Sequence, residues 1–198
     1  MSDQAEILEF REVTAADAPA LSELFRRSEC GCHCRYWHFQ GDKNAWLDRL
    51  RFTPEDSARE LAADLADPAL GTQGVIAVAG ARVTGWMKVS PASRLSKLYA
   101  QRPYRGMPDL GADRPSVYAI GCALVDPAER RKGLSRGLLD AALEAARRAG
   151  ASSVEAFPRD ATLLGDEELW MGPYQIFVER GFQRAHAIGQ YPVFRKEL

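Results

Sequence analysis

Apolar and polar positions along the 198-residue chain recur at spacings that separate strands from helices. Alternation over residues 6–13 predicts a strand, and the unbroken apolar run Val117–Val125 predicts a central strand that is buried. Apolar side chains at helical spacing predict helices from the Thr14 cap to about Arg27, over Pro54–Leu65, and from Leu134 to a stop at Gly150.

Glycine and proline positions divide the rest of the chain into shorter elements. These are a strand pair within 74–91, a strand over 152–157, a helix over 173–180 and a second strand pair within 181–198. Residues 30–44 and the proline-rich stretch 91–116 are expected to be irregular. The resulting order, β-α-α-β-β-β-α-β-α-β-β, predicts an α/β fold with a mixed sheet, formed as one domain over residues 1–198.

Composition and charge narrow the class of protein. The chain is 46% hydrophobic and 27% charged, so it can bury a core, and its net charge of −1 argues against binding nucleic acid through bulk positive charge. No apolar run reaches the roughly 18 residues of a membrane span, and the N-terminus does not resemble a signal peptide. Three of the four cysteines are too close together to frame a disulfide fold, which favours a cytoplasmic protein. The final strand pair could present an edge to a second copy in a homodimer.

Four cations gather where the helix after Val117–Val125 begins, at Arg130, Arg131, Lys132 and Arg136. A helix N-terminus already carries positive charge, so cations there are unfavourable unless an anion neutralises them. Gly133 would let a ligand approach the backbone, and the first-turn amides can hold phosphate oxygens. The segment therefore predicts a phosphate or pyrophosphate site, the alternative being a solvated basic helix start. Glycine-rich dinucleotide and P-loop signatures are absent from the sequence.

The stretch Val125-Asp-Pro, Arg130-Arg-Lys-Gly133-Leu-Ser135 and the later Glu179-Arg-Gly-Phe182 resemble the signatures of the GNAT superfamily of N-acetyltransferases. The resemblance runs along the whole chain and implies the GNAT fold, with acetyl-coenzyme A as co-substrate. It implies that the amides of Arg131 to Arg136 hold the pyrophosphate and that the backbone of Ala123, Leu124 and Val125 holds the pantetheine arm. The residues expected at the coenzyme are Ala123, Leu124, Val125, Arg130, Arg131, Lys132, Gly133, Leu134, Ser135 and Arg136.

The resemblance also suggests where the proton chemistry would lie. Family members often place a tyrosine, as general acid, four residues before the glycine of the terminal Gly-Phe, but this chain has Phe177 there. Tyr174, one helical turn earlier, could replace it, or solvent could protonate the thiolate; the other interpretation of Tyr174 is a packed aromatic. Glu155 on the strand 152–157 is the candidate general base, and its alternative is an ordinary strand carboxylate. Cys122 is expected to be a buried, inert thiol.

A dense group of cysteine, histidine and aromatic residues follows the first helix. Cys30, Cys32, His33, Cys34 and His38 are zinc-ligand types, but their C-x-C-x-C spacing has no distant partner pair, which favours no metal. The neighbouring Tyr36, Trp37 and Phe39 resemble the region that lines the family's acceptor pocket, and the alternative is an aromatic plug in the core.

Taken together, the residues and the resemblance predict an acetyl-coenzyme A-dependent N-acetyltransferase that acts by direct transfer to a primary amine of a small molecule. A peptide or protein acceptor is the alternative, because the long 91–116 loop could cover either. Arg94, Lys97, Arg102 and Arg105 in the 91–116 loop would suit an anionic acceptor, or they form a solvated surface. Because Phe177 replaces the usual acid, a coenzyme A-binding sensor or interaction module without catalysis is the main alternative. A zinc-stabilised binding module over 30–38 is the second.

Overall fold

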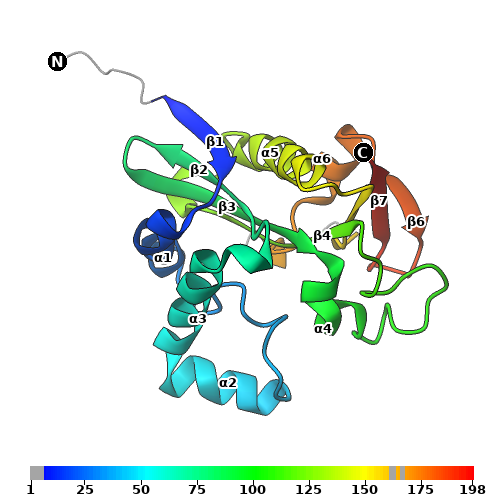
Figure 1. Cartoon of the computed structure of the whole chain (residues 1–198), viewed down its shortest axis with the longest axis horizontal. Helices are drawn as coiled ribbons and strands as arrows, with labels where there is room; N and C mark the ends of the chain where they lie inside the picture. Colours follow the sequence, from blue (N-terminus) through cyan, green and yellow to red (C-terminus); the bar gives the residue numbers. More distant parts are fainter. Residues whose placement is uncertain (1–6, 161–163, 166–167) are drawn as a thin grey trace.

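The computed structural model describes residues 7–160, 164–165 and 168–198, and in this part of the chain a seven-stranded mixed sheet lies between two layers of helices (Figure 1). The strands are β1 (Leu8–Glu12), β2 (Val75–Ala79), β3 (Arg82–Pro91), β4 (Val117–Val125), β5 (Ser153–Ala156), β6 (Gln183–His186) and β7 (Val193–Glu197). The helices are α1 (Ala18–Arg27), α2 (Lys43–Phe52), α3 (Pro54–Ala66), α4 (Ser96–Tyr99), α5 (Leu134–Arg148) and α6 (Tyr174–Glu179).

The strand order is β1-β2-β3-β4-β5-β7-β6, with β4 and β5 parallel and every other neighbouring pair antiparallel. The predicted α/β class with a mixed sheet is therefore confirmed. Each strand and helix predicted from hydrophobic spacing is present. The bounds of Val117–Val125 are unchanged, and the largest difference is at α1, which begins at Ala18, four residues after the Thr14 cap.

Two helices lie where the sequence predicts irregular chain. Helix α2 begins inside the stretch 30–44, and the Asp42 carboxylate caps it by accepting the Ala45 N–H at 2.9 Å. Its only buried residue is Trp46, so it shows little helical periodicity. Helix α4, a single turn within 91–116, is too short to produce such a pattern.

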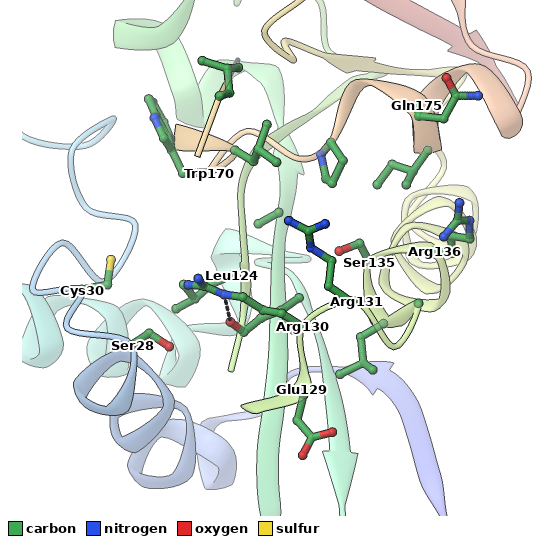
Figure 2. Close-up of a pocket in the computed structure, with 18 of the residues that line it drawn as sticks. Ser28, Cys30, Leu124, Glu129, Arg130, Arg131, Ser135, Arg136, Trp170 and Gln175 are labelled. Atoms are coloured by element: carbon green, nitrogen blue, oxygen red, sulfur yellow. Dashed lines mark hydrogen bonds between the residues drawn. The ribbon is translucent and has the colours of Figure 1, made fainter. Parts of the chain in front are cut away.

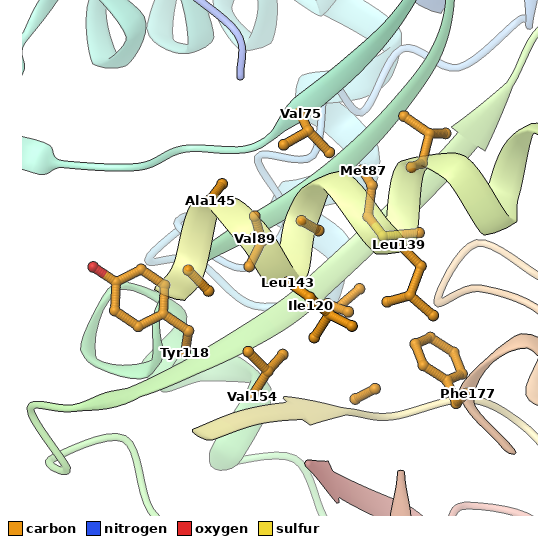
Figure 3. Packing of buried hydrophobic residues seen from close by; sticks show 14 of the residues in the cluster. Val75, Met87, Val89, Tyr118, Ile120, Leu139, Leu143, Ala145, Val154 and Phe177 are labelled. Carbon is orange, nitrogen blue, oxygen red and sulfur yellow. The ribbon is translucent and has the colours of Figure 1, made fainter. Parts of the chain in front are cut away.

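The two faces of β3 supply two separate cores. Met87 and Val89 face α5, where Figure 3 shows Leu139 and Leu143 packed over them. Side chains of the opposite face, such as the wholly buried Trp86, pack against α1. Because successive strand residues point to opposite faces, this alternation also sends Lys88 and Ser90 to the α1 side.

Strand β4 carries a bulge in the middle of the sheet. Lys88 of β3 pairs with Cys122 and the next residue, Val89, pairs with Ile120, so Gly121 is the extra residue. The Trp37 indole N–H donates to the carbonyl of Gly121 at 2.8 Å. The bulge therefore fixes the segment after α1 to the centre of the sheet.

Asp126, directly after β4, ties three elements together. Its buried carboxylate accepts hydrogen bonds from Arg82 at 2.6 Å, from Arg27 at 2.8 Å and from the Ala128 N–H at 3.1 Å. Burial alone would raise the pKa of Asp126, but the hydrogen bonds from Arg82 and Arg27 outweigh it and lower the pKa. The start of the 126–133 loop is thus held against α1 and β3.

We expect Asp126→Asn to lower the free energy of unfolding by roughly 3 kcal/mol. This is the lower end of the range for removing one partner of a buried ion pair, and we choose it because Arg27 and Arg82 are partly exposed to solvent. Chemical denaturation at neutral pH measures it. The pKa is lowered in the folded state, so the wild-type advantage should be present at neutral pH and fade as acid protonates Asp126. Asp140→Asn, which breaks an exposed pair with Arg180, is the control and should cost about 1 kcal/mol or less. Equal losses in both variants would contradict the anchoring role.

Candidate functional site

A cavity of about 640 Å³ lies beside the C-terminal half of β4 (Figure 2). Among the residues that the structure describes, β4 and β5 pair only through Val117–Ser153, Tyr118–Val154 and Ala119–Glu155. Beyond Ala119 the two parallel strands part, and the cavity lies beside the strand end left without that partner. Its volume is in the range typical of sites for small ligands and cofactors.

The walls of the cavity come from four segments that are distant in sequence. They are the residues after α1, the end of β4, the loop into α5, and the segment that enters α6. Figure 2 shows Ser28 and Cys30 on one side, with Ser135 and Arg136 across from them. The lining residues are Ser28, Glu29, Cys30, Ala123, Leu124, Val125, Glu129, Arg130, Arg131, Gly133, Leu134, Ser135, Arg136, Leu164, Leu169, Trp170, Pro173, Gln175 and Ile176.

The backbone of β4 presents alternate residues to the cavity. The Ala123 N–H donates to the Trp170 carbonyl on the cavity side at 2.7 Å, whereas the Asp126 N–H donates to Thr84 of β3 at 2.9 Å. Since backbone groups of successive strand residues point to opposite edges, Ala123 and Val125 face the cavity and Leu124 faces β3. Leu124 can therefore contribute its side chain to the wall, but its backbone is not directed at a ligand there.

The loop into α5 has the backbone geometry of an anion site. Arg131 and Gly133 have left-handed φ values of 65° and 84°, and Lys132 between them does not. Alternation of this kind turns successive N–H groups toward one point and forms a concave nest for anions. A Cβ added at Gly133 would meet nothing within 4 Å, so space for a ligand lies directly over the backbone. The Arg136 N–H donates to the Gly133 carbonyl at 3.0 Å, so this amide of the first turn is already engaged within the chain.

The structure brings together all ten residues expected at the coenzyme except Lys132. Its ammonium group forms an exposed pair with Glu129 at 3.0 Å instead. Arg136 lines the cavity while its guanidinium binds Glu179 of α6 through two bonds of 2.7 and 2.9 Å. Arg130 donates to the Val125 carbonyl at 3.5 Å, the dashed line of Figure 2. The loop is thus fastened to both β4 and α6.

The sequence profile of the acetyltransferase (GNAT) family matches residues 36–163, which is more than half of the chain. The chain belongs to the GNAT family. The predicted family and enzyme class are confirmed, and acetyl-coenzyme A is the co-substrate that goes with them. No curated protein matches the sequence significantly.

Solved structures resemble this acetyltransferase in fold. The PaiA N-acetyltransferase of Thermoplasma acidophilum, solved with coenzyme A, superposes with a TM-score of 0.57 at 13% identity and covers 97% of this chain and 99% of that one. The GNAT domain of S. lividans PAT gives 0.57 at 14% identity over 96% and 90% of the two chains. YncA of Salmonella typhimurium, a putative acetyltransferase solved with acetyl-CoA, gives 0.55 at 16% identity over 96% and 94%.

Neither predicted catalytic residue of this GNAT protein lines the cavity. The Tyr174 hydroxyl accepts a hydrogen bond from Arg184, and its ring packs edge-on against Phe194 at 5.0 Å. Tyr174 opens α6, and the next two residues, Gln175 and Ile176, are the ones that reach the cavity. Phe177, at the family's acid position, is wholly buried in the core beneath α5.

Glu155 is the centre of a buried ion-pair network. Its carboxylate is fully buried and accepts hydrogen bonds from Arg114 at 2.7 Å, Arg195 at 2.8 Å and the Tyr99 hydroxyl at 2.7 Å. Both oxygens are occupied by these donors, and Glu155 is not among the residues that line the cavity. The geometry therefore assigns Glu155 to the stability of the fold, in place of the base suggested by its strand position.

The thiols of the cysteine segment are protonated in the metal-free protein. Burial raises the pKa of Cys30 to about 11 and that of Cys32 to about 12, so a bound metal would have to displace both protons. Over residues 7–160, 164–165 and 168–198, no group of three or more side chains could hold a metal ion. The hydrogen bond with Cys34, followed by burial, raises the pKa of Cys122 well above its usual value, as in an unreactive thiol.

The aromatic residues expected in the acceptor pocket stand behind the cavity wall. Trp37 is buried and stacks on Trp170 at 5.5 Å, and Trp170 itself lines the cavity. Tyr36 and Phe39 lie further out and pack on Trp46 at 5.5 and 5.3 Å. Sequence reasoning missed Trp170 and Gln175, because no spacing indicates which loop residue will meet β4.

No helix of the described residues is long and apolar enough to cross a membrane.

We expect Glu155→Gln to destabilise the fold rather than to impair catalysis alone. Loss of the charge leaves Arg114 and Arg195 without their buried partner, which typically costs about 3–5 kcal/mol. Thermal melting measures the loss, and Glu168→Gln, at an exposed pair with Arg159, is the control. A variant with wild-type melting but turnover reduced by about 10² or more would restore Glu155 as a base.

Proposed function

We propose that this enzyme transfers the acetyl group of acetyl-coenzyme A directly to a primary amine of a small molecule, within a ternary complex. The observation that carries the proposal is the position of the cavity, which joins the anion nest at the start of α5 to the cavity-facing backbone of β4. A coenzyme thioester supplies the activated acetyl group when bound.

The chain's own groups fit the two ends of such a ligand. The amides of Lys132, Gly133 and Leu134 would hold the pyrophosphate, with the helix N-terminus adding its positive field. The backbone of Ala123 and Val125 would receive the pantetheine amides by strand-like hydrogen bonds. The Ala123 N–H is engaged with the Trp170 carbonyl, so that carbonyl would have to be displaced first.

Proton transfer in this proposal is left to water. Of the two carboxylates on the cavity wall, Glu129 is paired with Lys132 and Glu29 is exposed. A thiolate of coenzyme A is a fair leaving group, because thiols have a pKa near 8.5, so a missing general acid is tolerable. The raised pKa of Cys122 supports direct transfer over an acyl-enzyme.

A coenzyme A-binding sensor without catalysis is the second candidate function, because no hydroxyl group occupies the position of the general acid. Phe177 stands at that position, and the Tyr174 hydroxyl is bonded to Arg184 instead. Thiol release with a broad amine panel distinguishes the two. The cytoplasm remains the expected location, in keeping with four free thiols, and a homodimer through the edge strand β6 remains a prediction.

Gly133→Val should weaken coenzyme A binding by on the order of 100-fold, because about two charge-assisted hydrogen bonds of roughly 1.5 kcal/mol each would be lost. Calorimetry measures it. Gly150→Val is a matched control: φ is 83° there and 84° at Gly133, and a Cβ at either meets nothing within 4 Å. Both variants carry the same backbone strain, but only Gly133 lies in the cavity. Equal affinity in the two variants would overturn the proposed coenzyme site.

Tyr174→Phe should keep more than about half of wild-type turnover, because its hydroxyl is directed at Arg184 and solvent supplies the proton. A fully engaged general acid would instead cost roughly 10²–10⁴ in rate. Steady-state turnover with the best amine of the panel measures this, with coenzyme A affinity determined in parallel. A loss of 10² at unchanged affinity would identify Tyr174 as the acid.

A further inference from the structure

Three buried polar atoms gather on the α1 side of the sheet without hydrogen-bond partners. Lys88 Nζ, Ser90 Oγ and His38 Nε2 have none within the described part of the chain. The Lys88 and Ser90 side chains are wholly buried on the same face of β3. Since buried polar atoms are almost always hydrogen-bonded, three such atoms together indicate a site that binds something outside the chain.

The three groups are neighbours across the β4 bulge. Lys88 pairs with Cys122, immediately after the bulged Gly121, and Trp37 donates to the Gly121 carbonyl. His38 follows Trp37 in the chain. Burial, and next the nearby charge of Lys88, lower the pKa of His38 to about 2, so this imidazole is neutral. The bulge therefore brings the loop residue His38 near Lys88, which lies on the same face of β3 as Ser90.

The charges around Lys88 do not balance. Asp64 is shared by Arg35 at 2.6 Å and Arg94 at 3.6 Å. Glu60 is shared by Arg35 and Arg49, at 3.2 and 2.7 Å. Two carboxylates thus serve three guanidinium groups, and no carboxylate of the described residues is left within ion-pair distance of Lys88.

Lys88 keeps its proton despite its burial. Burial lowers the pKa of Lys88 to about 8, a value at which most molecules are still protonated at pH 7. A buried ammonium without a partner is strongly unfavourable, so this charge is suited to bind an anion. With Lys88 counted, four cations face the two carboxylates Glu60 and Asp64, so the region has an excess of positive charge that favours an anion.

The donors also match a carboxylate in kind. An ammonium and a serine hydroxyl donate hydrogen bonds, and a neutral imidazole can donate from Nε2, whereas an ionised carboxylate only accepts. The site lies directly behind the cavity wall: Cys30 and Leu124 line the cavity, and both pack against the cluster that contains Cys34 and Cys122. Lys88 lies close enough to those two thiols for their charges to act on its pKa.

We propose that Lys88, Ser90 and His38 form an anion subsite, and that the acceptor of this enzyme is an amine that also carries a carboxylate. The inference rests on the proposed function for the amine and the donor, and it adds the acceptor's second group. An acceptor anchored there would place its amine toward the cavity past Trp37 and Trp170, the stacked pair between the two regions.

The test uses pairs of amines that differ only in a carboxylate, such as phenylalanine against phenethylamine and lysine against 1,5-diaminopentane. The wild-type enzyme should prefer the carboxylate-bearing member by at least about 10-fold in kcat/KM, the size expected for a hydrogen bond to a charged group. In Lys88→Met the ratio should fall to near one, and in Ser90→Ala it should fall part of the way. Lys196→Met, on β7 and three strands away from β3, should keep the wild-type ratio.

A binding measurement tests the anion subsite independently of acetyl transfer. Calorimetric titration of the coenzyme A-loaded protein with 3-phenylpropionate, which lacks the amine, should give saturable heat in the wild type and in Lys196→Met but not in Lys88→Met. Melting curves check that Lys88→Met folds, which is expected because an apolar replacement of a buried charge is often neutral or stabilising.

Each negative result of these experiments points to a different error in the proposals. If coenzyme A does not bind and no amine is acetylated, the proposed function is wrong. If amines are acetylated equally with and without a carboxylate, and the acid gives no heat, the function stands and the anion subsite is wrong. A thiolate at Cys34 could then balance Lys88: burial would raise the pKa of Cys34, but hydrogen bonds from Cys122 and Trp86 and the charge of Lys88 lower it. Ultraviolet absorbance of a thiolate at neutral pH, lost in Cys34→Ser, would show this outcome.

Discussion

Strand β4 pairs with β3 over Tyr118–Val125 but with β5 along only three residues, and the functional half of the molecule follows from this constraint. The parting of the parallel strands opens the cavity on one side of β4. The bulge at Gly121 draws the segment after α1 onto the sheet through Trp37. Strand β4 therefore lies between the proposed coenzyme site, with its basic loop, and the buried side chain of Lys88.

Much of the fold could be predicted because its long elements have strong hydrophobic periodicity. The run Val117–Val125 and the apolar stripe of α5 are buried as their patterns indicate. The missed helices show the limit of that reasoning. Helix α2 buries one side chain, so its stability comes from its cap and from packing against α3, neither of which leaves a periodic signal.

The candidate site likewise has a part that could be predicted from the sequence and a part that could not. The loop around Gly133 could be located because its chemistry is local: cations, a glycine and a helix start lie within seven residues. The side chains proposed for proton transfer could not be placed, because their roles depend on distant partners. Glu155 meets Arg114 and Arg195, each about 40 positions away, and Tyr174 of α6 meets Arg184 of β6. No spacing in the sequence encodes those contacts, and the unpartnered Lys88 is visible only once its surroundings are known.

The bond from the Ala123 N–H to the Trp170 carbonyl has a consequence for the protein before it meets any ligand. A strand that loses its neighbour in mid-sheet exposes donors and acceptors that another chain could pair with, and such edges promote aggregation. Here Trp170 satisfies the donor of Ala123, and Arg130 covers the acceptor of Val125. The enzyme thus covers this unpaired stretch of strand backbone with its own chain, at the place proposed to receive the coenzyme.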